Sequence, residues 1–217
     1  MRRKIGVIIL AGLLCCMAAG CLNSVKTADT KAVLDTLLTK EQAGEQCIYI
    51  REDDTFTDVI AESFEEEYYS LDELKTLVTE EIAAYNEKNP VEDGEAIKLV
   101  SLELKEKEAV LVLQYDSWKD LTAYSAEEEF AQAAISSAVM TEADRLEGSF
   151  IGADGEAVVT SDVLSKAVKK KYHMITASGK DMTIYLERPI LCVSDNVTVI
   201  DEYTVQVTAD ESIIVTR

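Results

Sequence analysis

The sequence has little of what most catalytic and metal sites require, because its 217 residues include one histidine, His173, and five cysteines. Zinc sites use several Cys or His ligands at close spacing, and three of the cysteines lie in the first 21 residues. We therefore expect no zinc site. A Ser-His-Asp triad would have to use His173, whose alternate neighbours Ile175 and Ala177 are apolar. This alternation predicts a histidine packed in a strand.

Motifs of other enzyme classes are also missing. No glycine-rich phosphate loop is present. The tripeptide Ser194-Asp195-Asn196 matches one motif of penicillin-binding enzymes, but the Ser-x-x-Lys and Lys-Thr-Gly motifs that accompany it are absent. Its position between two apolar runs indicates a turn. The sequence thus predicts a protein that is not an enzyme and that needs no cofactor and no metal ion.

Positive charge is scarce, with 21 Lys and Arg against 41 Asp and Glu. Phosphate binding depends on Lys and Arg, so nucleic acid is excluded as a partner, and adsorption to anionic lipid is disfavoured. Solubility is the simplest reason for a large net charge. Positively charged partners and loosely held divalent cations stay open as alternatives.

The only long apolar run lies at the N-terminus. Arg2, Arg3 and Lys4 precede an uncharged run of 16 residues, from Ile5 to Gly20. A spanning helix needs about 20 apolar residues, whereas a charged segment, a short apolar core and a small-residue cleavage site form a secretory signal. The pattern predicts export, with residues 1–20 as the signal peptide.

The signal ends in Ala18-Ala19-Gly20-Cys21, which resembles the lipobox of bacterial lipoproteins. This resemblance implies that the Cys21 thiol carries a diacylglyceryl group and that Cys21 becomes the mature N-terminus. Removal of the three leader cations changes the formal charge from −20 to −23. Residues 22–30 are short and polar, and together with the lipidated Cys21 they predict a tether. The expected location is the outer face of the cell membrane.

Two cysteines remain in the predicted mature chain, Cys47 and Cys192. An exported pair can form a disulfide, but both lie in apolar, strand-like stretches. Because cysteine often serves as a small buried hydrophobe, we expect two reduced, buried thiols.

Periodicity predicts an α+β domain over residues 31–217, with a boundary near residue 145 as the alternative. Residues 31–39 carry a short helical stripe, and residues 46–64 read as a hairpin turning at Asp53-Asp54. A Ser70–Glu73 capping box opens a helix over residues 71–88. Two strands follow, joined by a charged turn. Ser125 and Glu128 form a second capping box, which predicts a helix to about residue 140.

The second half reads as strand-rich. Asp154-Gly155 predicts a hairpin turn, and a helix over about residues 161–171 ends in three lysines. The strands around residues 172–177 and 181–187 are expected to pair across Ser178-Gly179. Four short strands are expected near 190–194, 197–200, 203–208 and 212–216. The predicted architecture is antiparallel hairpins packed with about three amphipathic helices and a strand-rich C-terminal tail.

Acidic and aromatic side chains are the remaining candidates for a site. The densest acidic groups are residues 65–67 and 127–129, which we interpret as solvated, although a pair of carboxylates could also hydrolyse glycosides. Tyr68, Tyr69, Trp118 and Tyr124 are expected to pack in the core. Any of them that is exposed would mark a partner site.

Three stretches, residues 63–90, 112–125 and 187–201, together resemble a group of uncharacterised lipoproteins of Gram-positive bacteria. The resemblance implies a lipid-anchored protein and assigns no functional residue. The sequence therefore predicts an extracytoplasmic lipoprotein with a non-catalytic binding or structural role. Its partners would be the membrane, through the lipid, and an unidentified protein or small molecule. A solute-binding receptor and a carboxylate-based hydrolase are the alternatives.

Overall fold

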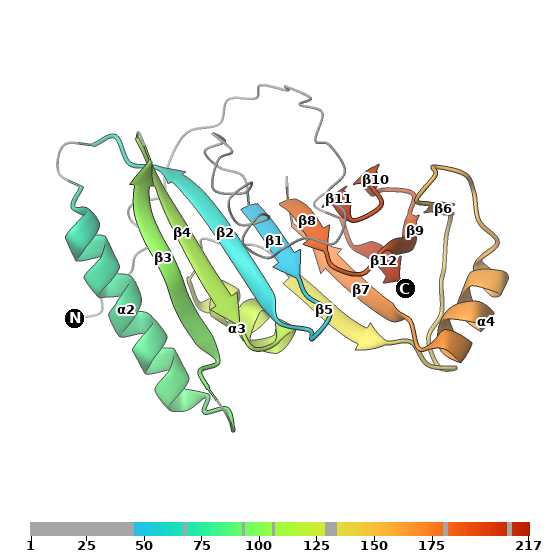
Figure 1. Cartoon of the computed structure of the whole chain (residues 1–217), viewed down its shortest axis with the longest axis horizontal. Coiled ribbons are helices and arrows are strands. Elements are labelled where there is room, and N and C mark those ends of the chain that lie inside the picture. The colour runs from blue at the N-terminus through green and yellow to red at the C-terminus, as the bar shows by residue number, and fades with distance from the viewer. Residues whose placement is uncertain are drawn as a thin grey trace.

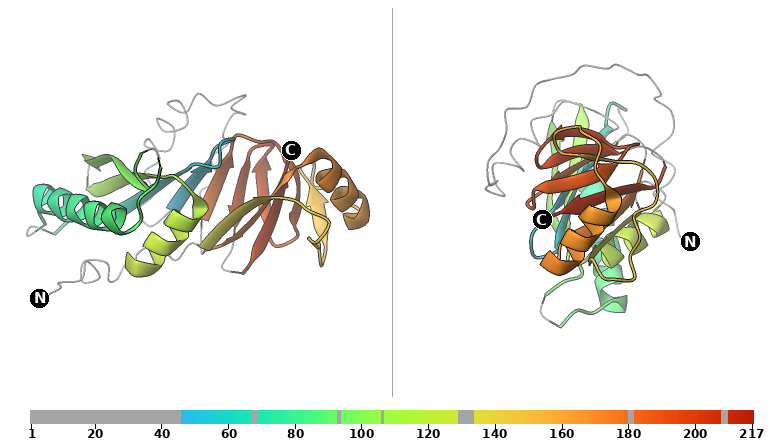
Figure 2. Two further views of the ribbon diagram at one scale, coloured as in Figure 1. Left: turned by 90° about the horizontal axis from the view of Figure 1, so that it is seen from below. Right: turned by 90° about the vertical axis from the view of Figure 1, so that its right-hand side faces the viewer.

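The computed structural model describes residues 46–66, 69–92, 94–105, 107–128, 134–179, 182–207 and 210–217. Within these residues the protein is a mixed α and β structure in which strands dominate, with three helices and twelve strands in two sheets. The molecule is elongated, with helices α2 (Leu71–Lys88) and α4 (Thr160–Lys170) at opposite ends (Figures 1 and 2). The expected α+β class agrees with this coarse description.

A seven-stranded sheet forms the larger part of the structure. Its strand order is β10-β11-β8-β1-β2-β4-β3. The strands are β1 (Gln46–Ile50), β2 (Phe56–Ser63), β3 (Ile97–Lys105), β4 (Glu108–Tyr115), β8 (Met182–Leu186), β10 (Thr198–Asp201) and β11 (Thr204–Val207). The hairpins β1–β2 and β3–β4 confirm the two predicted strand pairs of the N-terminal half. Strand β1 also pairs with β8 in parallel, so strands from both halves of the chain build this sheet.

A five-stranded antiparallel sheet forms the second layer, in the order β5-β7-β12-β9-β6. Its strands are β5 (Ala134–Val139), β6 (Phe150–Gly152), β7 (His173–Ser178), β9 (Ile190–Ser194) and β12 (Ser212–Thr216). The four strands predicted for the C-terminal tail are therefore confirmed as β9 to β12. They divide between the two sheets, a division that local periodicity does not encode.

The predicted pairing of β7 with β8 is wrong. Strand β7 lies in the five-stranded sheet between β5 and β12, whereas β8 lies in the seven-stranded sheet between β1 and β11. All five residues of β8 are buried, and the strand has neighbours on both edges. A short connection favours a hairpin, but the apolar neighbours available in the fold outweigh it here.

Helix α2 confirms the clearest local prediction. It spans Leu71–Lys88, and its N-cap residue Ser70 accepts a hydrogen bond from the Glu73 backbone N–H at 3.3 Å. Val78, Ile82 and Tyr85 are buried on its inner face. The helix ends at Asn89, before Pro90, because a residue that precedes proline is disfavoured in the helical region.

The predicted helix that starts after Ser125 is wrong. Helix α3 spans Trp118–Glu128, so Ser125 lies inside it, and β5 occupies part of the predicted span. The N-terminus is set by Ser117, whose hydroxyl accepts a hydrogen bond from the Asp120 backbone N–H at 3.4 Å. Ser125 is buried in the interior of the helix. Two Ser-x-x-acid patterns thus compete within one stretch, and the earlier one caps the helix.

The remaining local predictions are confirmed in part. Helix α4 spans Thr160–Lys170 and ends at Lys171 in a left-handed conformation. The predicted turn at Asp154-Gly155 is present, with Gly155 at a φ of 80°. Its second strand is reduced to one antiparallel bridge between Ile151 and Ala157. The segment of residues 31–39 lies outside the described residues.

The main hydrophobic core lies between the two sheets and beneath the helices α2 and α3. It joins Ile48 and Phe56 of the seven-stranded sheet with Ile175 and Ile214 of the five-stranded sheet. A smaller core lies between α4 and the other face of the five-stranded sheet. The two sheets therefore share one main core, which positions the β1–β2 turn beside β7.

Candidate functional site

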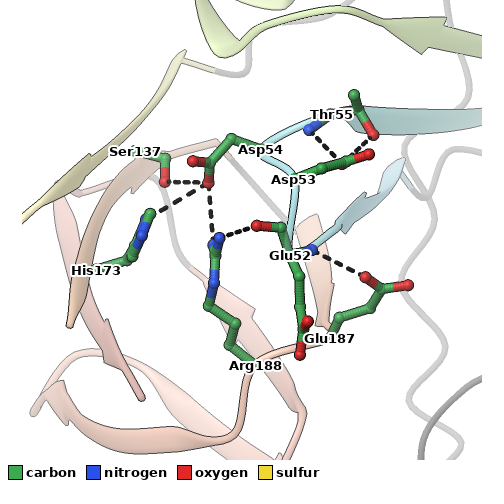
Figure 3. Close-up of polar contacts among 8 residues, drawn as sticks. All are labelled: Glu52, Asp53, Asp54, Thr55, Ser137, His173, Glu187 and Arg188. Atoms are coloured by element: carbon green, nitrogen blue, oxygen red, sulfur yellow. Dashed lines mark hydrogen bonds and ion pairs between the residues drawn. The ribbon is translucent and has the colours of Figure 1, made fainter. Parts of the chain in front are cut away.

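The β1–β2 turn is shaped by its acidic residues. The Asp53 side chain accepts hydrogen bonds from the Thr55 backbone N–H at 3.0 Å and from the Thr55 hydroxyl at 2.7 Å. Asp54 follows with a φ of 62°, a left-handed conformation that aspartate tolerates better than most residues. This geometry directs the Asp54 carboxylate toward the five-stranded sheet (Figure 3).

Three side chains converge on Asp54 Oδ1, and we call these four residues the Asp54 cluster. Arg188, from the loop between β8 and β9, donates a hydrogen bond at 3.0 Å. The Ser137 hydroxyl of β5 donates at 3.4 Å. Nδ1 of His173, at the start of β7, lies 3.4 Å away without the alignment of a hydrogen bond. The cluster therefore ties the turn of one sheet to two strands of the other (Figure 3).

The segment that supplies Arg188 is fixed by further contacts. Arg188 also donates to the backbone carbonyl of Glu52. The neighbouring Glu187 accepts from the Tyr49 hydroxyl at 2.6 Å and from the Glu52 backbone N–H at 2.8 Å. These bonds reach Tyr49 in β1 and Glu52 in the first part of the β1–β2 turn, so the loop after β8 is anchored to the end of β1.

The electrostatics of the cluster favour neutral His173. Burial lowers the pKa of His173, and the nearby Arg188 guanidinium lowers it further, while Asp54 opposes the shift. A serine nucleophile needs the histidine as its base, with the aspartate on the far side of the ring. Here Ser137 and His173 both meet the same aspartate oxygen, so the aspartate lies between them. This arrangement braces the fold and does not activate the serine.

A second ionisable group is buried inside the main core. Asp58 of β2 is fully buried, and its cross-strand partners Ile48 and Leu113 are also fully buried. Its Oδ2 accepts a hydrogen bond from the Gln46 amide at 3.0 Å, whereas Oδ1 has no hydrogen-bond partner among the described residues. Burial raises the Asp58 pKa to about 7, against the lowering effect of the Gln46 bond.

Three tyrosines pack near this carboxyl group. The rings of Tyr85 and Tyr124 meet edge to face with centroids 5.5 Å apart, and the Tyr115 ring lies 6.2 Å from that of Tyr124. Burial raises the pKa of Tyr115, and Asp58 raises it further. The Tyr85 hydroxyl donates to Asp120 at 3.3 Å. These contacts link α2, α3 and β4 through a core that is partly polar.

The aromatic candidates of the sequence are packed as expected where the structure describes them. Tyr124 is buried, and Trp118 is half-buried against the main core. Tyr69 is half-buried, with its ring centroid 5.0 Å from that of Phe64. Tyr68 lies outside the described residues. The aromatic side chains that are described therefore do not form an exposed binding surface.

The remaining candidates have structural positions. Ser194 and Asn196 hydrogen bond to each other at 2.6 Å and tie the β9–β10 turn to β12, which confirms the predicted turn. Cys47 and Cys192 are buried thiols in different sheets, as predicted, and burial raises the Cys192 pKa to about 12. Glu65 forms an exposed ion pair with Lys107 at 3.1 Å. Cys21 lies outside the described residues.

Sequence reasoning missed Asp58 and Arg188. Asp58 has the same alternation parity as Phe56 and Ile60, which are apolar, so the pattern itself indicated an inward carboxyl group. Nothing in the local sequence marks Arg188, because its partners come from the turn after β1 and lie far away in the chain. The sequence places His173 in a strand and Asp54 in a turn, but their proximity depends on the packing of the two sheets.

No protein-family model, curated protein or solved structure matches this chain. Across the ranges that the structure covers, no three metal-ligating side chains gather at one place. None of the helices α2, α3 and α4 combines the length and the apolar character needed to cross a membrane.

Proposed function

We propose that this protein is a lipid-anchored extracytoplasmic lipoprotein with a non-catalytic binding or structural role in the cell envelope. The location rests on the leader and on Cys21, as read from the sequence. The role rests on one observation, the convergence of Ser137, His173 and Arg188 on Asp54 Oδ1. The side chains best suited to acid–base chemistry are engaged in holding the two sheets together.

The fine architecture is part of this proposal. Antiparallel hairpins packed with amphipathic helices form one domain over residues 31–217, and the strand-rich C-terminal part completes both sheets. The parallel pair β1–β8 and the shared core between the sheets support a single unit. The acidic surface keeps this unit in solution beside the membrane that holds its lipid anchor.

Cys21→Ala should release the protein from the membrane, because the variant lacks the thiol that would carry the diacylglyceryl group. Two acyl chains give stable anchoring, and their loss leaves only weak attraction. Membrane and medium fractions would be compared by immunoblotting after the precursor and the processed form have been separated. The matched control is Cys15→Ala with Cys16→Ala, which should stay with the membrane. A processed Cys21→Ala variant that remains in the membrane fraction would contradict the anchor.

His173→Phe should leave the biological role intact, because His173 acts here as a neutral packed side chain. The measurement is rescue of any phenotype of the gene deletion, with surface amount and thermal unfolding recorded for each variant. His173→Gln serves as a second variant that keeps polar character. Loss of rescue by a folded variant at its normal amount would make His173 functional and would favour an enzyme.

A further inference from the structure

Helix α4 concentrates positive charge in a chain that is otherwise strongly acidic. Four of the 21 Lys and Arg lie within residues 166–171, although the whole chain has 41 Asp and Glu. These four, Lys166, Lys169, Lys170 and Lys171, have exposed side chains, and we call them the lysine face. Cations favour the C-terminal end of a helix dipole, which accounts for Lys169 and Lys170 in the last turn but not for Lys166, one turn earlier.

The packing of α4 turns the lysine face away from the sheet that the helix covers. Val163 and Ala167 are buried, and Leu164 and Val168 pack against the same core. The lysines occupy the opposite side of this amphipathic helix. Residues 163–179 contain no Asp or Glu, so the later turns of α4 and the following strand β7 supply no neutralising charge.

The neighbouring acidic loop also leaves the lysine face unpaired. The loop between β5 and β6 packs Leu146 into the core beneath α4, and it carries Glu142, Asp144 and Glu147. Among the residues that the structure describes, no carboxylate forms an ion pair within 4.0 Å with any of the four lysines. Asp144 instead accepts hydrogen bonds from the backbone N–H and the hydroxyl of Thr141. The positive charge is therefore available to a partner.

Exposed apolar side chains flank the lysine face. Val159, the N-cap residue of α4, is 63% exposed, and Val139 at the end of β5 is 43% exposed. Val139 pairs with His173, two residues beyond Lys171. Lysines beside exposed apolar groups suit the interface of a bilayer, where cations meet anionic headgroups and apolar groups enter the acyl boundary. A soluble polyanion would offer the two valines no such contact.

The shape of the molecule weakens the opposing effect of its net negative charge. Helix α4 lies at one end of the elongated structure, and α2 lies at the other (Figures 1 and 2). At physiological ionic strength, interactions between exposed charges are largely screened beyond about 8 Å. With the α4 end on a bilayer, the acidic groups of distant elements such as α2 would therefore be screened from the anionic headgroups.

We propose that the lysine face docks the anchored domain on anionic phospholipid headgroups, with α4 toward the bilayer and α2 away from it. This docking rests on the proposed lipid anchor, which holds the domain beside the bilayer at a high effective concentration. The lysines then need only orient a domain that is already there. Each lysine close to an anionic surface favours this orientation about fivefold.

The experiment uses the full-length gene product, purified from membranes in mild detergent and reconstituted into phosphatidylcholine vesicles with or without phosphatidylglycerol. Flotation of the vesicles tests the anchor, and labelling by an amine-reactive ester is then quantified for each lysine by peptide mass spectrometry. On the anionic vesicles, labelling of Lys169, Lys170 and Lys171 should fall about fivefold relative to the neutral vesicles, and high salt should restore it. Lys75 and Lys88 of α2 are exposed and should be labelled equally on both kinds of vesicle.

Lys169→Gln with Lys170→Gln should remove most of the protection of Lys166 and Lys171 on anionic vesicles. The matched control is Lys75→Gln with Lys88→Gln, which removes the same charge from α2 and should leave that protection unchanged. Both pairs are exposed, so neither variant should alter thermal unfolding. Equal loss of protection in the two variants would show that the total charge, and not the lysine face, sets the orientation, and would overturn the proposal.

Three further outcomes would contradict the docking. The first is unchanged labelling of the lysine face on anionic vesicles, and the second is an equal fall in labelling at both ends of the molecule. The third is protection by polyphosphate, added to the protein on neutral vesicles, without protection by anionic vesicles, which would assign the lysine face to a soluble polyanion. A protein that floats with neither kind of vesicle lacks the anchor, and this result would refute the proposed function together with the docking.

Discussion

Asp58→Asn should stabilise the protein at pH 8 by about 2–4 kcal/mol and should remove much of the pH dependence of unfolding between pH 4 and pH 8. The upper figure follows from a pKa raised from 3.8 to about 7, at about 1.4 kcal/mol for each tenfold change in proton affinity. Asparagine keeps the acceptor for Gln46 and carries no charge. The variant therefore removes the unfavourable burial of a carboxylate at high pH.

The sign follows from proton linkage. Below about pH 4 the Asp58 carboxyl is protonated in both the folded and unfolded states, so the folded state carries no charge penalty. As the pH rises toward about 7, the unfolded chain loses this proton while the folded chain retains it. The free energy of unfolding of the natural protein therefore falls across this range, and the Asp58→Asn variant lacks this contribution.

The measurement is urea unfolding of both proteins at several pH values from 4.5 to 8.5. Asp195→Asn is the matched control, because Asp195 is exposed in the β9–β10 turn. It should change the midpoint little, as surface substitutions usually do. The quantity compared is the difference in unfolding free energy between the Asp58→Asn variant and the natural protein. If this difference is the same at every pH, Asp58 does not titrate in the range given by its burial.

Asp54→Asn should destabilise the protein by about 1–3 kcal/mol. The Arg188 side chain is 13% exposed and would lose its carboxylate partner, and removal of one partner of a buried pair leaves an uncompensated charge. The Asp54 side chain is 42% exposed, so solvent screening places the effect below that of a fully buried pair. Asparagine tolerates the left-handed backbone at this position. The measured change in stability therefore reports the loss of the charge and not a strained backbone.

Glu65→Gln is the matched control for this substitution. It makes the same change from acid to amide in an ion pair with Lys107. The side chains of Glu65 and Lys107 are 57% and 75% exposed, respectively. Exposed pairs contribute about 0–1 kcal/mol, so its unfolding midpoint should stay nearly unchanged. Equal effects of the two substitutions, measured by urea unfolding at pH 7, would show that the Asp54 cluster is not a brace between the sheets.

Local elements could be predicted from this sequence because their causes are local. Ser70 and the apolar stripe fix α2, and alternating apolar residues fix the hairpins β1–β2 and β3–β4. Strand β5 was missed because its sequence contains no strong strand former beyond Ile135 and Val139, and its state depends on pairing with β7. Tertiary contacts commonly override such weak propensities.

The candidate site was less predictable than the fold. Asp54 and His173 lie on different sheets, and Arg188 comes from a loop whose position depends on the placement of β8. Local periodicity pairs β8 with β7, whereas β8 lies between β1 and β11, so these contacts cannot be predicted from the sequence pattern. Asp58 differs, because the alternation of residues within β2 is enough to predict that its side chain points into the core.

The parallel pairing of β1 with β8 has a consequence for how the protein folds. Residues 46–50 pair with residues 182–186, so one edge of the N-terminal hairpin stays open until most of the polypeptide is available. Such long-range pairing raises contact order and slows folding, and an open strand edge can pair with another chain. A truncated or stalled chain that ends before β8 would expose this edge. The protein therefore depends on completed synthesis, and on protection of its early hairpin, before it reaches its native state.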